Sequence, residues 1–322
     1  MKGSFHIKVS RKRGTVFEFD VRRNITVIRG DSGTGKTTLY NMVVDHMRMG
    51  DRSGVSIQCD RPCVALTDTD WKHQIEALID SIIFVDEGFE DILSHDFSKE
   101  VKQSSNYFVI FCRAELSSLP YSVNEVYRIK TSGKKYHSLA PIYKELDRFR
   151  FSPVLHRNFD VLLTEDSKSG LQFYTSRFKG SSVRCETSGG NASIVQWLLD
   201  HADDHVFVVA DGAAFGPYID RLFKLRASSP GKFVICLPES FEWLLLKSEI
   251  VHSADLEDML ENPGAQIESK TYASWERFFV KYLSNLTTGT PLAYDKKNLA
   301  EGYKAQPNAD KVMALIACRN VK

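Results

Sequence analysis

ITVIRGDSGTGKTTLYNMVV, residues 25–44, combines an apolar run, a glycine-rich segment and a second apolar-rich segment in one short stretch. Its first residues have the composition of a buried strand, and its last residues favour a helix. Gly30, Gly33 and Gly35 lie between them, where glycine allows backbone conformations that other residues rarely adopt. The stretch therefore predicts a strand, a tight loop and the first turns of a helix.

The loop has the spacing G-x-x-x-x-G-K-[ST], which is typical of phosphate-binding loops. In such a loop several backbone N–H groups point at one phosphate, at the N-terminus of the following helix. We expect Lys36 to reach the β- and γ-phosphate oxygens and the Thr37 hydroxyl to bind Mg²⁺. A glycine-rich surface turn without a ligand is the alternative. The predicted cofactors are ATP and Mg²⁺, and the predicted nucleotide-binding residues are Gly30, Asp31, Ser32, Gly33, Thr34, Gly35, Lys36, Thr37 and Thr38.

A second apolar run, residues 81–85, ends on Asp86 and Glu87. It resembles the Walker B element of P-loop ATPases, and the pair of carboxylates is similar to that of the additional-strand class. The resemblance implies that Asp86 binds Mg²⁺ opposite Thr37, and that Glu87 orients and deprotonates the attacking water. It favours ATP hydrolysis over phosphoryl transfer to a small molecule. The alternative is a strand that ends in a solvated acidic turn.

A third apolar run, residues 107–112, is followed by Arg113. In the same superfamily the strand after Walker B carries a polar sensor at its carboxyl end, beside the γ-phosphate. The resemblance therefore implies that Arg113 senses or neutralises charge on that phosphate. An ordinary surface arginine is the alternative. Lys36, Glu87 and Arg113 are the predicted catalytic residues of this half.

Composition is that of an ordinary globular protein, with 322 residues, 43% hydrophobic and 26% charged. Such a chain is long enough for two domains. No apolar run approaches the length of a membrane span, and the first residues have no signal-peptide core. The six cysteines are scattered, several of them in apolar runs, which is typical of free thiols in a reducing compartment. We therefore expect a cytoplasmic protein with no membrane partner.

Charge gives no general signature of nucleic-acid binding, because the net charge is only +1. Lys8, Arg11, Lys12 and Arg13 crowd one expected hairpin turn, which suits a phosphate contact or, alternatively, a solvated turn. The charged segment at residues 143–151 is the expected linker. We therefore predict a P-loop ATPase domain with a parallel sheet at residues 1–150, followed by a second α/β domain at residues 151–322.

The second half alternates expected strands and helices. Four apolar runs, at 161–164, 182–185, 205–210 and 233–237, each end in acidic or glycine-rich residues. This pattern predicts a parallel sheet with a site at one edge. Residues 253–322 are expected to be helical, and an aromatic stripe at helical spacing favours a packed core over a base-stacking surface. The stripe consists of Trp275, Phe278, Phe279, Tyr282 and Leu283.

Residues from about 160 to 250 resemble the Toprim domain of topoisomerases, primases and OLD-family nucleases. The resemblance implies that Glu165 and Asp211 are catalytic carboxylates that bind Mg²⁺, with Glu239 or Glu242 as a further acidic ligand. Ala213 stands where the family has a second aspartate, so the implied metal site is altered. Ordinary strand-end carboxylates of a doubly wound sheet are the alternative.

Two functions follow from these resemblances. In the first, ATP hydrolysis gates a Mg²⁺-dependent nuclease that acts on DNA or RNA, similar to the ATPase–Toprim fusions of bacterial defence against phage. In the second, the Toprim-like domain has no chemistry, and the chain is a nucleotide-driven switch or scaffold that binds a protein partner or another copy of itself. Convergence of Glu165, Asp211, Glu239 and Glu242 on one metal-sized space would favour the first function.

Overall fold

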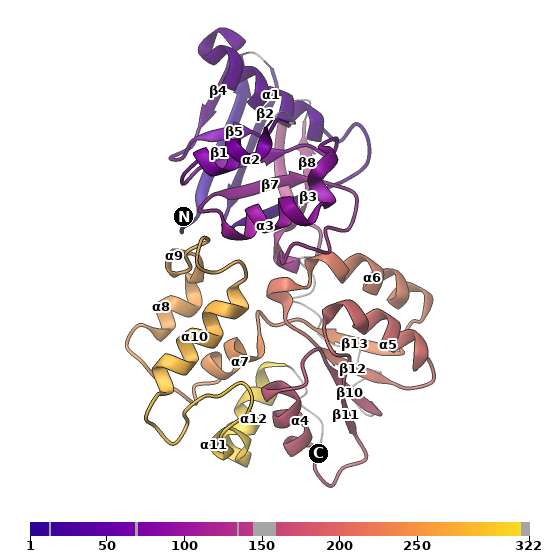
Figure 1. Ribbon diagram of the computed structural model, residues 1–322. Coiled ribbons are helices and arrows are strands. Elements are labelled where there is room, and N and C mark those ends of the chain that lie inside the picture. Colours follow the sequence, from indigo (N-terminus) through magenta and orange to yellow (C-terminus); the bar gives the residue numbers. More distant parts are fainter. Residues whose placement is uncertain (13, 68–69, 134, 144–158, 317–322) are drawn as a thin grey trace. The chain divides into compact units, whose positions relative to one another are not determined.

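The computed structural model describes residues 1–12, 14–67, 70–133, 135–143 and 159–316. The chain is α/β and forms two compact units, one with a mixed sheet and one with a parallel sheet (Figure 1). Unit 1 consists of Met1–Tyr143 and Glu261–Ser274, and unit 2 of Lys144–Leu260 and Trp275–Lys322.

The domain division differs from the predicted ranges in one segment. Residue 150, the predicted boundary, lies outside the described residues, as does the expected linker beyond Tyr143. The segment Glu261–Ser274, which was predicted to lie in the second domain, belongs to unit 1. The chain therefore enters unit 1 twice.

Unit 1 is built around a sheet whose strands, in chain order, are β1 (Phe5–Arg11), β2 (Val16–Val21), β3 (Ile25–Arg29), β4 (Val55–Gln58), β5 (Cys63–Ala65), β6 (Ile82–Val85), β7 (Tyr107–Phe111), β8 (Val126–Ser132) and β9 (Tyr136–Pro141). Among the described residues the sheet has nine strands in the order β4-β1-β2-β9-β8-β3-β7-β6-β5. All neighbours from β8 to β5 are parallel. The carboxyl ends of β3, β6 and β7 therefore lie at one edge of the sheet.

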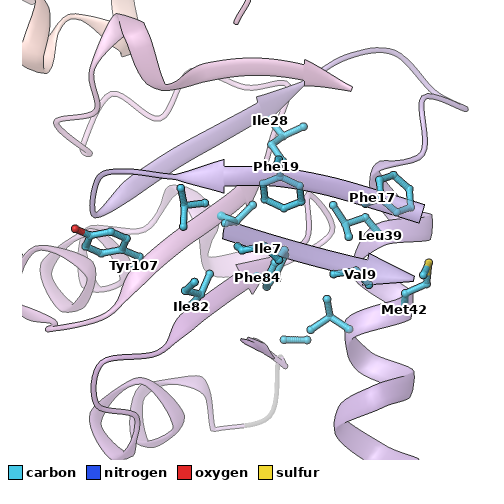
Figure 2. Packing of buried hydrophobic residues seen from close by; sticks show 14 of the residues in the cluster. Ile7, Val9, Phe17, Phe19, Ile28, Leu39, Met42, Ile82, Phe84 and Tyr107 are labelled. Carbon is cyan, nitrogen blue, oxygen red and sulfur yellow. The ribbon is translucent and has the colours of Figure 1, made fainter. Parts of the chain in front are cut away.

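The helices of unit 1 are α1 (Lys36–Met49), α2 (Trp71–Ala77), α3 (His95–Gln103) and α9 (Pro263–Gln266), with short 3₁₀ turns η1 (Gly50–Ser53), η2 (Glu90–Leu93) and η3 (Val123–Glu125). Alternate residues of β1 and β2 are buried and pack with the apolar face of α1 (Figure 2). This packing holds the N-terminus of α1 firmly beside the end of β3. The labelled residues of this core include Ile7, Val9, Phe17, Phe19, Leu39 and Met42.

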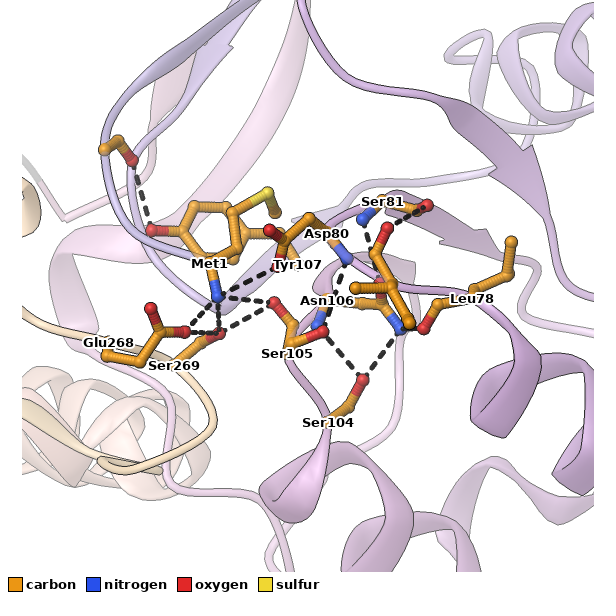
Figure 3. Close-up of polar contacts among 12 residues, drawn as sticks. Met1, Leu78, Asp80, Ser81, Ser104, Ser105, Asn106, Tyr107, Glu268 and Ser269 are labelled. Carbon is orange, nitrogen blue, oxygen red and sulfur yellow. Dashed lines mark hydrogen bonds and ion pairs between the residues drawn. The ribbon is translucent and has the colours of Figure 1, made fainter.

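The segment Glu261–Ser274 is held to the rest of unit 1 by polar contacts (Figure 3). The amino group of Met1 lies 3.0 Å from Ser269 Oγ, and Asn24 Nδ2 donates a hydrogen bond to the Ala273 carbonyl at 3.0 Å. Because the Asn24 amide is buried, this bond satisfies a polar group that would otherwise cost stability. The segment is thus an integral part of unit 1.

Unit 2 contains a four-stranded parallel sheet in the order β11-β10-β12-β13 among the described residues, as the four apolar runs predicted. Its strands are β10 (Val161–Thr164), β11 (Arg184–Thr187), β12 (Val206–Val209) and β13 (Phe233–Cys236). Its helices are α4 (Ser169–Arg177), α5 (Ile194–Asp200), α6 (Ile219–Ser228), α7 (Phe241–Lys247), α8 (Leu256–Glu261), α10 (Trp275–Thr287), α11 (Glu301–Lys304) and α12 (Gln306–Leu315), with 3₁₀ turns η6 (Asn191–Ser193), η7 (Gly212–Ala214) and η8 (Gly216–Tyr218).

Helix α10 carries the aromatic stripe. Trp275, Phe279 and Leu283 are buried, whereas Phe278 and Tyr282 are half-buried and stack on each other with ring centroids 5.8 Å apart. The stripe therefore serves core packing, as predicted. Over the described residues, every helix is too short or too polar to cross a lipid bilayer.

Candidate functional site

The glycine-rich loop joins the buried strand β3 to helix α1, as predicted. Gly30, Gly33 and Gly35 have φ values of +146°, +81° and +100°, a region in which other residues are strained. Asp31 and Ser32 are exposed. The loop therefore adopts a path that depends on its glycines and presents its outer residues to solvent.

The N-terminus of α1 lies at the end of this loop. Gly35 is the N-cap, and no side chain caps the helix. The first turn contains no acidic residue. The partial positive charge of a helix N-terminus therefore faces the loop without compensation, which favours an anion.

Lys36 is almost fully buried, with 4% of its surface exposed. Its ammonium group donates to the carbonyl oxygens of Gly30 and Asp31, the latter at 3.0 Å, and lies 3.9 Å from Glu87 Oε2. The loop thus curls around a cation.

Arg113 links the loop to the end of β6. Its Nη2 atom lies 3.0 Å from Ser32 Oγ and 3.0 Å from Glu87 Oε1. The structure thus brings three of the predicted residues, Lys36, Glu87 and Arg113, into one polar cluster. Strand order explains the contact: β7, which ends before Arg113, lies between β3 and β6.

Asp86 and Thr37 are the residues that would hold Mg²⁺. Asp86 Oδ2 accepts a hydrogen bond from the Gly88 amide at 3.2 Å, while its Oδ1 is enclosed and has no hydrogen-bond partner among the described residues. An enclosed carboxylate oxygen without a donor is costly unless a cation binds it. Thr37 and Thr38 are exposed on the first turn of α1. A carboxylate oxygen without a partner and an exposed hydroxyl are both of the chemical type that Mg²⁺ accepts as ligands.

Unit 2 brings Glu165 and Asp211 together, because they follow the adjacent strands β10 and β12. Asp211 is 7% exposed, and its Oδ1 accepts a hydrogen bond from the Phe241 amide at 3.1 Å. Glu165 is half-exposed as a residue, but its Oε2 is enclosed and has no hydrogen-bond partner among the described residues. Both carboxyl groups thus lie away from bulk water.

Burial sets the protonation of this pair. It is the main reason that the pKa of Glu165 is raised from its ordinary value of 4.5 to about 7. The negative charge of Glu276 raises this pKa further, and the hydrogen bond with Asp211 lowers it. Burial, followed by the charges of Glu165, Glu276 and Glu242, raises the pKa of Asp211 well above its usual range. The cluster therefore favours bound protons near neutral pH.

Lys296, which follows α10, also belongs to this cluster. Lys296 Nζ lies 2.8 Å from Glu276 Oε1 and 3.7 Å from Glu242 Oε1. Burial lowers the pKa of Lys296, but the charges of Glu242 and Glu276 outweigh it and leave the pKa raised. The ammonium group therefore remains charged and partly neutralises the carboxylates.

Glu242 lies at the base of the cluster and is completely buried. Tyr294 donates a hydrogen bond to its Oε1, and Ser169 Oγ lies 2.8 Å from the Tyr294 hydroxyl. Burial raises the pKa of Glu242. Tyr294 and Glu276 are members that the sequence did not reveal, because they lie on or after α10, far along the chain from β10 and β12.

The predicted metal ligands do not all share one environment. Glu239 is half-buried and contributes its carbonyl oxygen to a hydrogen bond from Ala213 N at 3.2 Å. Ala213 is buried, and it provides no carboxylate at the position where Toprim domains have a second aspartate. Within the described residues, no group of three or more His, Cys, Asp or Glu side chains is arranged to hold a metal ion.

Known proteins give no independent guide to either unit. Comparisons with protein-family models, curated proteins and solved structures find no match for this chain. The interpretation of both clusters therefore depends on their residues and geometry.

The raised pKa of Glu165 predicts a specific dependence of stability on pH. The unfolded chain releases this proton near pH 4.5, whereas the folded unit retains it to about pH 7. Because the folded state binds more protons in this window, stability falls as pH rises through it, by about 3 kcal/mol, and stays lower above it. We expect Glu165→Gln to remove this loss, so that the variant is more stable than wild type at pH 8 but not at pH 4.5.

Urea unfolding of unit 2 at both pH values measures this effect. Glu257→Gln, on the exposed side of α8, removes the same charge outside the cluster and serves as the control. A Glu165→Gln variant that is less stable than wild type at pH 8 would contradict the assignment, since it would mean that the ionised carboxylate stabilises the fold.

Proposed function

We propose that this chain is a P-loop ATPase, in which unit 1 binds ATP with Mg²⁺ and hydrolyses it. The observation that carries the proposal is the convergence of Lys36, Glu87 and Arg113 beside the glycine-rich loop. The Glu87 carboxylate lies 3.9 Å from Lys36 Nζ and 3.0 Å from Arg113 Nη2. A buried lysine, a carboxylate and an arginine beside an uncapped helix N-terminus are the groups needed to bind a triphosphate and to activate water.

Strand order adds support. The additional-strand class of P-loop ATPases is named for a strand between the one that leads into the loop and the one that ends in the Walker B carboxylates. Here β7 lies between β3 and β6. Each strand is fully buried, so the order is fixed by the core and the relative positions of Lys36, Glu87 and Arg113 are maintained.

The residues have separate roles in this proposal. Backbone N–H groups of the loop and the Lys36 ammonium bind the β- and γ-phosphates, while Thr37 and Asp86 hold Mg²⁺, which supplies charge neutralisation of the phosphate oxygens. Glu87 orients the attacking water and accepts its proton. Arg113 exchanges its contact with Glu87 for the γ-phosphate, which leaves the Glu87 carboxylate available to the water.

The direct test uses the purified full chain. Isothermal titration calorimetry with ATP in the presence of Mg²⁺ measures binding, and phosphate release measures hydrolysis, with a chelator added as the control. We expect binding and Mg²⁺-dependent phosphate release. A chain that binds no nucleoside triphosphate would overturn the proposal.

For unit 2 we propose the role of a nucleotide-driven switch or scaffold rather than a nuclease. The observation that favours this choice is Lys296, whose ammonium group lies 3.7 Å from Glu242, one of the predicted metal ligands, and 2.8 Å from Glu276. Ala213 removes a further ligand, and Mg²⁺ requires several oxygen ligands to replace its hydration shell. Such a unit would report the ATP state to a protein partner or to another copy of the chain.

The nuclease alternative has a clear test. Wild type, Glu165→Ala and Asp211→Ala are incubated with plasmid and with single-stranded DNA and RNA, with and without ATP, in Mg²⁺ or Mn²⁺. We expect no cleavage by wild type on any substrate, and ATP hydrolysis nearly unchanged in both variants. Metal-dependent cleavage by wild type that both variants lose would contradict this and would identify Glu165 and Asp211 as metal ligands.

A further inference from the structure

We propose that His137, stacked on Phe17, is the platform on which the purine base of the bound nucleotide lies. The inference rests on the proposed ATP site, since it assigns the part of that site that recognises the base. The glycine-rich loop and Lys36 contact only phosphates in that proposal. The ribose and base must therefore be held by other residues beside the loop.

Phe17 and His137 form an aromatic pair beside the loop. A methyl group placed on Gly35 would lie 3.5 Å from two atoms of the Phe17 ring, so this ring lies beside the loop. The imidazole of His137 lies against Phe17, with ring centroids 4.6 Å apart and planes 19° apart. Phe17 is buried and His137 is half-buried. An aromatic ring with an accessible surface thus lies one ring away from the phosphate-binding loop.

The register of the sheet fixes this arrangement. Phe17 on β2 and Thr131 on β8 are both Cα partners of His137 on β9, so the three side chains form a row on one face of the sheet. His137 Nδ1 lies 3.0 Å from Thr131 Oγ1, which orients the imidazole. Its Nε2 has no hydrogen-bond partner among the described residues.

These features suit a purine nucleoside triphosphate. Stacking on a planar side chain binds any base, and a purine offers the larger ring surface. The remaining imidazole nitrogen can bond to the base or to a ribose hydroxyl. The preorganised ring would contribute base affinity without contacting the phosphates, so the two parts of the ligand can be tested separately.

Calorimetry of the full chain with ATP and with inorganic tripolyphosphate, each with Mg²⁺, separates the base from the phosphates. We expect His137→Ala to weaken ATP binding by about five- to tenfold and to leave tripolyphosphate binding unchanged. His137→Phe retains a stacking ring and should stay close to wild type for both ligands. His6→Ala, which removes an exposed histidine of β1 that contacts Asp20 and Glu18, is the matched control and should change neither affinity.

Each result is decisive. If His137→Ala weakened the binding of ATP and of tripolyphosphate equally, the ring would only support the loop. If it left ATP affinity unchanged, the base would lie elsewhere. Either result would overturn the role of His137 and leave the ATPase proposal intact. Failure of wild type to bind either ligand would instead overturn the ATPase proposal.

Discussion

Glu87→Gln should retain ATP binding and lose most of its turnover, by about 100-fold or more, the range expected when a general base is removed. Glutamine keeps the shape of the side chain and can still accept a hydrogen bond from Arg113, which lies 3.0 Å from Glu87 Oε1 in the wild type. It cannot accept a proton from the attacking water. Phosphate release at saturating ATP, together with calorimetric affinity, separates the two effects.

The segment that follows β6 offers a control for this experiment. Glu90 is exposed and follows Glu87 closely in the turn after β6, so Glu90→Gln makes the same chemical change outside the cluster. We expect its turnover to match wild type. If Glu87→Gln hydrolysed ATP at the wild-type rate, Glu87 would have no role as a base, and the position of Arg113 beside it would need another explanation.

Lys36→Ala should weaken ATP binding by about 2 kcal/mol or more, which is the scale of a charge-assisted hydrogen bond to a phosphate. The physical reason is that Lys36 is the buried cation within the loop itself, at 4% exposure. Calorimetry with ATP and Mg²⁺ measures the loss. Equal affinity in variant and wild type would refute the assignment of the loop to phosphate binding.

Loss of binding could also result from a disordered loop, because the Lys36 ammonium donates to the carbonyls of Gly30 and Asp31. Lys36→Met retains most of the buried bulk and distinguishes the two causes. We expect it to unfold at nearly the wild-type temperature and still to bind ATP weakly. Lys72→Ala removes an exposed lysine that is paired with Asp96 and should change neither property.

The path of the glycine-rich loop between β3 and α1 could be predicted because all its determinants are contiguous. The apolar strand, the glycine spacing and Lys36 lie within residues 25–36, so no knowledge of long-range packing was needed. The contact between Arg113 and Glu87 was different. It requires β7 to lie between β3 and β6, and strand order is set by packing among distant segments that the local pattern does not encode.

Two further features had little or no signal in the sequence. Strand β9, Tyr136–Pro141, is half-buried along most of its length and has no run of alternating apolar residues, so the aromatic pair of Phe17 and His137 could not be foreseen. Lys296 and Glu276 join the carboxylates of unit 2 through tertiary packing alone. Their residue types are common on protein surfaces, and only the fold makes them neighbours.

The return of Glu261–Ser274 to unit 1 affects how this protein can fold during its synthesis. An N-terminal domain ordinarily completes its fold while the ribosome is still making the next one. Here the partner of the Asn24 amide is the Ala273 carbonyl, which is translated only after the whole sheet of unit 2. Unit 1 therefore reaches its final form late, and the glycine-rich loop emerges from the ribosome long before the rest of unit 1 is complete.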